Sequence, residues 1–184
     1  MISLPLLKRN MSQTWKILLI LLAAMTLYTT VIIYMYDPEL AHMLNDYQIA
    51  LPGIMSAVGM TGIAGNLTEF VYIYLYGFIM LVFPIIAIII LGNKLLAHYI
   101  DSGSMGVLLA TPNSRLKILL TQLLSMLAGI TLLIVLITAI GVGTCEGLFP
   151  GELDIPLFLK LNGALLLFHL MLGGIAFLPA CIFN

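Results

Sequence analysis

Long apolar stretches alternate with short polar ones along the chain, and four of the apolar stretches are long enough to cross a membrane. They cover residues 17–36, 70–91, 119–145 and 159–182. A helix needs roughly 20 apolar residues to cross the hydrocarbon core of a bilayer, and lipid offers no partner for an unpaired backbone amide. The pattern therefore predicts an all-α integral membrane protein, with four transmembrane helices in a single transmembrane domain over residues 1–184.

Charged residues are scarce, and their positions predict the orientation. The chain is 62% hydrophobic and 8% charged, whereas soluble domains carry about 25% charged residues. Six of the seven cationic residues precede the first apolar stretch (Lys8, Arg9, Lys16) or lie between the second and third (Lys94, Arg115, Lys117). Residues 37–69 and 146–158 contain acidic residues and no Lys or Arg, and Lys160 alone follows just beyond them. Because Lys and Arg are retained on the cytoplasmic side, we predict a cytoplasmic N-terminus and a cytoplasmic loop over residues 92–118. No basic cluster indicates nucleic-acid binding.

Two further segments flank the first apolar stretch. Residues 1–14 combine apolar residues with Lys8 and Arg9, which predicts an amphipathic helix lying on the inner membrane surface. Residues 37–69 form an outer loop that is long for a connector, and we expect a polar helix over residues 38–50. The following segment, 51–70, is apolar and rich in glycine. It suits either packing against other helices at the outer surface or a re-entrant path into the membrane.

The loop over residues 92–118 contains the pattern of a short helix. Met105, Leu108 and Leu109 are spaced i, i+3, i+4 and would share one helical face. Ser102 or Ser104 can cap the start of this helix, and Pro112 ends it because the residue before a proline is displaced from the helical region. Ser114 is expected to cap the next helix, which continues into the third transmembrane stretch. The loop would therefore hold a short helix with an apolar ridge, although a plain connector is an alternative.

Arg115 and Lys117 occupy the first turn of that next helix. The helix macrodipole disfavours cations there by about 0.3–1 kcal/mol. Inner-leaflet phosphates or an acidic partner surface would favour them, and an ordinary positively charged membrane anchor is the alternative explanation.

Residues 101–115 resemble a known cytoplasmic-loop signature. The segment holds Asp101, then Gly103-Ser104, then Leu108-Leu109, then Pro112, and finally Ser114-Arg115. This order is similar to that of the type-2 exporter family of ABC transporter permeases, and the surrounding pattern matches over the whole chain. In that family the loop forms a coupling helix that docks into a separate ATPase subunit. The resemblance therefore implies an ATPase-coupling site made of Gly103, Ser104, Met105, Leu108, Leu109, Pro112 and Arg115.

The resemblance also implies the partners and the cellular setting. The chain would be a transport subunit of the bacterial cell membrane and not an enzyme, with no cofactor, metal or catalytic residue of its own. ATP and Mg would bind to the partner ATPase, and a second permease copy or paralogue would complete the transporter. Family members have six spans, whereas this chain shows four and ends at "LPACIFN". We therefore expect the N-terminal part of a six-helix permease, truncated at its C-terminus.

A different class of function is the alternative. No motif of intramembrane hydrolysis and no Walker motif is present in the sequence, so ATP hydrolysis would come from another polypeptide. A small ion- or proton-coupled carrier or an assembly factor, without an ATPase, would instead use an ionisable residue such as His169 or Glu69. An ionisable residue within a membrane is a functional candidate, but a neutral His169 bonded to a neighbouring helix would equally fit the sequence.

Overall fold

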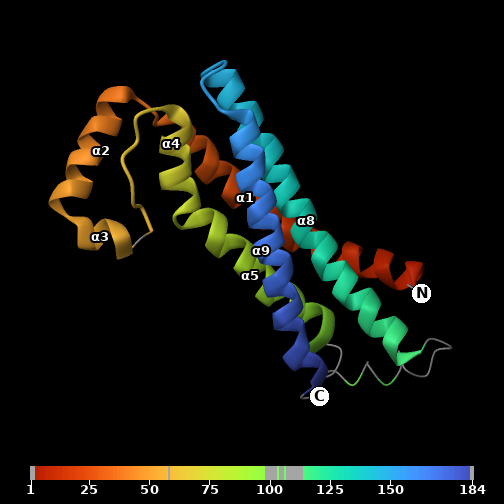
Figure 1. Cartoon of the computed structure of the whole chain (residues 1–184). Helices are drawn as coiled ribbons and strands as arrows, with labels where there is room; N and C mark the ends of the chain where they lie inside the picture. Colours follow the sequence, from red (N-terminus) through yellow and green to blue (C-terminus); the bar gives the residue numbers. More distant parts are fainter. Residues whose placement is uncertain (1–2, 58, 98–102, 104–105, 107–113, 183–184) are drawn as a thin grey trace. The chain divides into compact units, whose positions relative to one another are not determined.

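The structure is a computed structural model that describes residues 3–57, 59–97, 103, 106 and 114–182. Figure 1 shows the helices in chain order. They are α1 (Leu4–Tyr34), α2 (Pro38–Ala50), α3 (Pro52–Ala57), α4 (Leu67–Val71), η1 (Tyr72–Tyr76), α5 (Ile79–Gly92), η2 (Asn93–Ala97), α8 (Arg115–Leu148) and α9 (Ile155–Ile182). The described residues contain no strand. The predicted all-α class is confirmed.

Four helical segments are long and apolar enough to cross a membrane, as predicted. The second of them covers Leu67–Leu95 and is built from α4, η1, α5 and the first turn of η2; we call it span two. The other three are α1, α8 and α9. The predicted surface segment and the first predicted span lie on one continuous helix, α1. The apolar side chains near its N-terminus differ in exposure: Leu6 is buried, whereas Leu4 is 73% exposed.

Residue contacts divide the chain into two compact units. Unit 1 comprises Met1–Leu21, Pro84–Ile134 and Leu166–Asn184, and unit 2 comprises Leu22–Phe83 and Val135–Leu165. Unit 1 is a packing of helix segments. A Cβ atom on Gly129 of α8 would lie 3.2 Å from Leu91 Cδ1 and 3.4 Å from Leu18 Cδ1. This glycine therefore lets side chains from span two and α1 pack directly against the α8 backbone.

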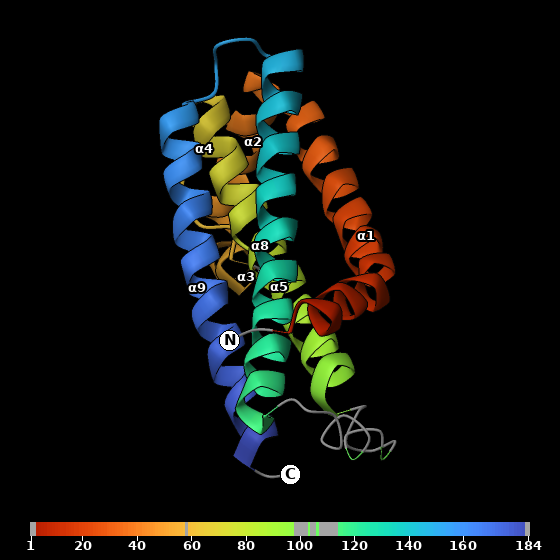
Figure 2. The same cartoon turned by 90° about the vertical axis from the view of Figure 1, so that its right-hand side faces the viewer.

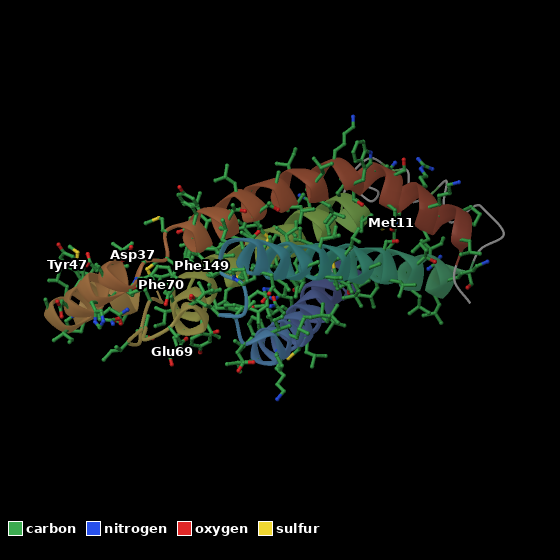
Figure 3. The ribbon with its side chains drawn as sticks, turned by 90° about the horizontal axis from the view of Figure 1, so that it is seen from above. Met11, Asp37, Tyr47, Glu69, Phe70 and Phe149 are labelled. Carbon is green, nitrogen blue, oxygen red and sulfur yellow. The ribbon has the colours of Figure 1, made fainter. Side chains whose placement is uncertain are left out.

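Unit 2 is built around aromatic side chains. The ring of Tyr36 packs edge-on against Phe70 and against Phe149, with ring centroids 5.4 Å apart in both pairs; Figure 3 labels Phe70 and Phe149. The ring of Tyr36 therefore joins the chain just after α1 to span two and to the residue that follows α8.

The start of α9 is tied to the start of span two. Thr68 Oγ1 accepts a hydrogen bond from the backbone N–H of Asp154 at 2.9 Å, and the carboxylate of Asp154 accepts from the N–H of Leu157 at 3.0 Å. The side chain of Asp154 thus caps the first turn of α9, where an acidic group also complements the helix dipole.

Candidate functional site

The predicted site residues fall largely outside the described part of the chain. Ser104, Met105, Leu108, Leu109 and Pro112 lie outside the described residues, and so does the rest of the predicted short helix apart from Gly106. Gly103 is described, and its φ of 69° is in the left-handed region that favours glycine. Its carbonyl accepts a hydrogen bond from the N–H of Gly106 at 3.1 Å. Both glycines are exposed.

The predicted helix start after the loop is confirmed. Ser114 Oγ accepts a hydrogen bond from the N–H of Lys117 at 3.3 Å, and the Ser114 carbonyl accepts from the N–H of Ile118 at 3.2 Å. Arg115, the last of the predicted site residues, is the first residue of α8 and is exposed. The first turn of α8 carries no acidic residue, so its own sequence does not neutralise the two cations.

Span two is bonded to α1 at the end that leads into the loop. Lys94, on η2, donates a hydrogen bond from Nζ to the backbone carbonyl of Gln13 at 2.7 Å. The acceptor lies in the N-terminal part of α1. A charged donor strengthens such a bond relative to a neutral one, so this contact fixes the last turn of span two to α1.

A set of buried polar residues joins the same part of α1 to the first turns of α8. The backbone N–H of Ser3 donates to Thr121 Oγ1 at 3.1 Å. Asn10 Nδ2 donates to Gln122 Oε1 and to Ser125 Oγ, the latter at 2.9 Å. All of these residues are buried. We call this set, Ser3, Asn10, Thr121, Gln122 and Ser125, the α1–α8 polar contact.

The two attachments involve Ser3 and the first turns of α1. Residues 3–13 bond to span two just before the loop and to α8 just after it. Figure 2 shows the N-terminal turns of α1 beside α8. The helix ends on both sides of residues 98–113 are therefore connected through α1, independently of the loop itself.

Sequence reasoning missed the α1–α8 polar contact. It considered the apolar and basic residues of the N-terminal segment, but Asn10 and Thr14 are spaced i, i+4 and are both buried. Their spacing, together with the polar residues at 121, 122 and 125 in an otherwise apolar stretch, was the available signal. Polar side chains within membrane helices commonly hydrogen-bond across helices.

The two ionisable residues of the alternative function have different surroundings. His169 on α9 is fully buried, and its ring packs edge-on against Phe168 with centroids 5.2 Å apart. Glu69 is exposed, and its Oε2 accepts a hydrogen bond from the N–H of Gly65 at 2.7 Å. Glu69 thus stabilises the turn that leads into α4.

Comparison with known proteins gives a family. A family model described as "ABC-2 family transporter protein" matches residues 7–182. Searches among curated proteins and among solved structures gave no match. The match covers all four candidate membrane helices apart from the first residues of α1.

Proposed function

Since the chain belongs to the ABC-2 family of transporter proteins, we propose that it is the permease subunit of an ATP-driven exporter and is coupled to a separate ATPase through the loop at residues 92–118. The chain is a multi-pass membrane protein and a transport subunit. In the proposed assembly, two ATPase subunits bind ATP and Mg, and a second permease copy or paralogue completes the translocation path. The N-terminus and the loop face the cytoplasm of a bacterial cell.

The observation that carries this proposal is the attachment of α1 to both ends of the loop. Lys94 connects span two to α1, and Asn10 connects α1 to α8. A displacement of the loop by a partner would therefore reach three membrane helices at once. Packed helices and interfaces tend to switch between discrete arrangements rather than deform continuously, so such a joint suits the transmission of a nucleotide-driven movement.

The exposed cation at the start of α8 supports the same proposal. Arg115 is exposed and lacks an acidic neighbour in its helical turn. An acidic rim on the ATPase would offset the unfavourable helix dipole at this position. The apolar pair Leu108 and Leu109 would supply the buried centre of the contact, since interface cores are more apolar than their rims.

Co-purification tests this assignment. The wild-type chain, expressed together with the proteins encoded beside its gene, is expected to co-purify with an ATP-hydrolysing protein. The Leu108→Asp/Leu109→Asp double variant is expected not to co-purify with it. Leu148→Asp is a matched control, because Leu148 is an exposed leucine at the other end of α8. Retention of the ATPase by the double variant, or absence of any ATPase from the folded wild-type protein, would contradict the proposal.

The same preparation separates the carrier alternative. Transport by a permease driven through the loop should survive His169→Ala, apart from a loss of stability, because no step of the proposed mechanism uses this side chain. A proton-coupled carrier that uses His169 would lose transport and its pH dependence. Loss of transport in a stably folded His169→Ala variant that still binds the ATPase would therefore favour a direct role of His169.

A further inference from the structure

The segment between α1 and span two doubles back along span two. We call α2, α3 and the returning residues 59–66 the α2–α3 hairpin. Figure 1 shows α3 at the end of α2 that is further from α4, and the chain returning from there to the start of α4. Three positions place the hairpin along span two. Ala64 belongs to the same core cluster as Phe70, Gln48 Nε2 donates to the Tyr74 hydroxyl at 3.3 Å, and Gly59 lies against Gly77.

The contact between Gly59 and Gly77 is a direct approach of two backbones. A Cβ atom on Gly59 would lie 2.2 Å from the carbonyl oxygen of Gly77, and one on Gly77 would lie 2.4 Å from the carbonyl oxygen of Gly59. Gly59 also has a φ of 73°. Neither position has room for a side chain. The placement of the chain around Gly59, which we call the hairpin tip, is therefore specific.

The depth of this contact follows from the geometry of span two. Phe70 marks the start of its apolar stretch, directly after Glu69. At a rise of 1.5 Å per residue, Gly77 lies about 10 Å further along the helix. The hydrocarbon core of a bilayer is about 30 Å thick. The hairpin tip therefore lies beside a part of span two that must itself be within the hydrocarbon.

Two amide side chains of α2 pair with the irregular backbone of the returning residues. Asn45 Nδ2 donates to the Ala64 carbonyl and Asn45 Oδ1 accepts from the Ala64 N–H, both at 3.0 Å. The N–H of Gly62 donates to Gln48 Oε1 at 2.9 Å. Both amide side chains are buried. Non-helical backbone at membrane depth is tolerated where protein groups pair with it, and these two side chains supply that pairing.

The exposed side of the hairpin tip is apolar. No Asp, Glu, Lys or Arg occurs between Asp46 and Glu69. The large exposed apolar side chains of this part of the hairpin are Tyr47, Ile49, Leu51, Ile54 and Ile63, of which Ile49 is 71% and Ile54 62% exposed. Figure 3 shows Tyr47 on the outer side of α2. Exposed apolar side chains concentrated on one segment indicate a membrane or protein contact.

From the depth, the pairing of backbone groups with Asn45 and Gln48, and the absence of charge, we propose that residues 47–57 and 59–63 form a re-entrant membrane segment whose exposed side chains contact lipid acyl chains. The leaflet is the one opposite the loop at residues 92–118, because the hairpin adjoins the other end of span two. This proposal rests on membership of a membrane family and not on ATPase coupling. It can therefore fail while the co-purification succeeds, and the reverse also holds.

Tryptophan fluorescence in vesicles tests the proposal. Trp15 is the single tryptophan, so Trp15→Phe gives a silent background into which Ile54→Trp or, as a control at the exposed start of α2, Glu39→Trp is introduced. The protein is reconstituted in phosphatidylethanolamine and phosphatidylglycerol vesicles containing phosphatidylcholine brominated midway along one acyl chain. We expect the Ile54→Trp emission to be lost to the brominated lipid and protected from iodide. The Glu39→Trp emission should show the opposite behaviour.

Two outcomes would overturn the proposal. Quenching of Ile54→Trp by iodide as strong as that of Glu39→Trp would place the tip in water. Protection from both quenchers would mean that protein, such as a second copy of the chain, covers it. Ile63→Trp, at another exposed position of the hairpin, is a second probe if the first variant does not fold, and the same two outcomes apply to it.

Discussion

Removal of the Asn10 carboxamide tests the α1–α8 polar contact. In the Asn10→Leu variant, the hydrogen bonds from Nδ2 to Gln122 Oε1 and to Ser125 Oγ are lost. Ser125 keeps a partner, because its hydroxyl also donates to the Thr121 carbonyl at 2.7 Å. Gln122 keeps no partner, because its Oε1 loses the bond from Asn10 and its Nε2 already has no hydrogen-bond partner among the described residues. The whole carboxamide of Gln122 would then be buried and unpaired.

The expected cost follows from these two effects. Hydrogen bonds between membrane helices contribute about 0.6 kcal/mol each on average, so two lost bonds correspond to about 1 kcal/mol. A buried polar group left unpaired adds about 1–3 kcal/mol. The two effects sum to about 2–4 kcal/mol. The substitution also removes Asn10 Oδ1, a buried acceptor without a hydrogen-bond partner among the described residues, so we expect Asn10→Leu to lower the free energy of unfolding by an amount in the lower half of this range, about 2–3 kcal/mol. Removing both partners in Asn10→Leu/Gln122→Leu should cost less than the sum of the single variants, because no unpaired carboxamide then remains.

Reversible unfolding by SDS in mixed micelles measures these differences. Thr14→Val is the matched control, because the Thr14 hydroxyl donates to carbonyls of its own helix, those of Asn10 and Met11. Thr14 is buried, as Asn10 is, but these two bonds stay within α1 and do not join it to another helix. If Asn10→Leu costs no more than Thr14→Val, or if the two leucine substitutions are additive within about 0.5 kcal/mol, the contact does not join α1 to α8 as described.

Three other expectations concern different parts of the chain. Gly59→Ala should lower the free energy of unfolding by at least about 1–2 kcal/mol, from its positive φ alone, whereas Gly53→Ala, with nothing within 4 Å of the new Cβ, should be tolerated; equal stability of the two variants in the SDS assay would contradict the packing of the hairpin. Tyr76→Phe removes the hydroxyl that accepts a hydrogen bond from Asn162 Nδ2, and a loss of about 0.5–1.5 kcal/mol is expected by the same measurement; no loss would mean that the bond adds nothing. A cysteine introduced by Ser104→Cys should react with a membrane-impermeant maleimide in inside-out vesicles and not in intact cells, and the reverse labelling would refute the cytoplasmic position of the loop.

The spans were predictable from the sequence because their signal is local. Four apolar stretches of sufficient length gave four membrane helices, and the helix predicted over residues 38–50 is α2, with Asp37 accepting from the N–H groups of Glu39 and Leu40 at its start. The path of the chain after α2 was not predictable in this way. It depends on Asn45 pairing with Ala64, nineteen residues away. A pattern of apolar and polar positions identifies a buried amide but not its partner.

In the candidate site, too, contacts between neighbours in the chain were predictable and contacts between distant residues were not. The cap at Ser114 was predictable because it involves neighbours in the chain. The bond from Lys94 to the Gln13 carbonyl joins residues 81 positions apart. Its acceptor is a backbone atom, which every residue carries, so no choice of side chain at position 13 signals the contact. The predicted coupling residues between 104 and 112 stay a prediction.

The glycine pair of the hairpin has a consequence for how this sequence can change over generations. At each position the obstacle to a side chain is the other residue's carbonyl group, which every amino acid possesses. No replacement at one position can therefore make room for a larger residue at the other. Among related chains, we expect these two alignment columns to keep glycine together, or to lose it together in lineages whose segment between the first two spans has a different length.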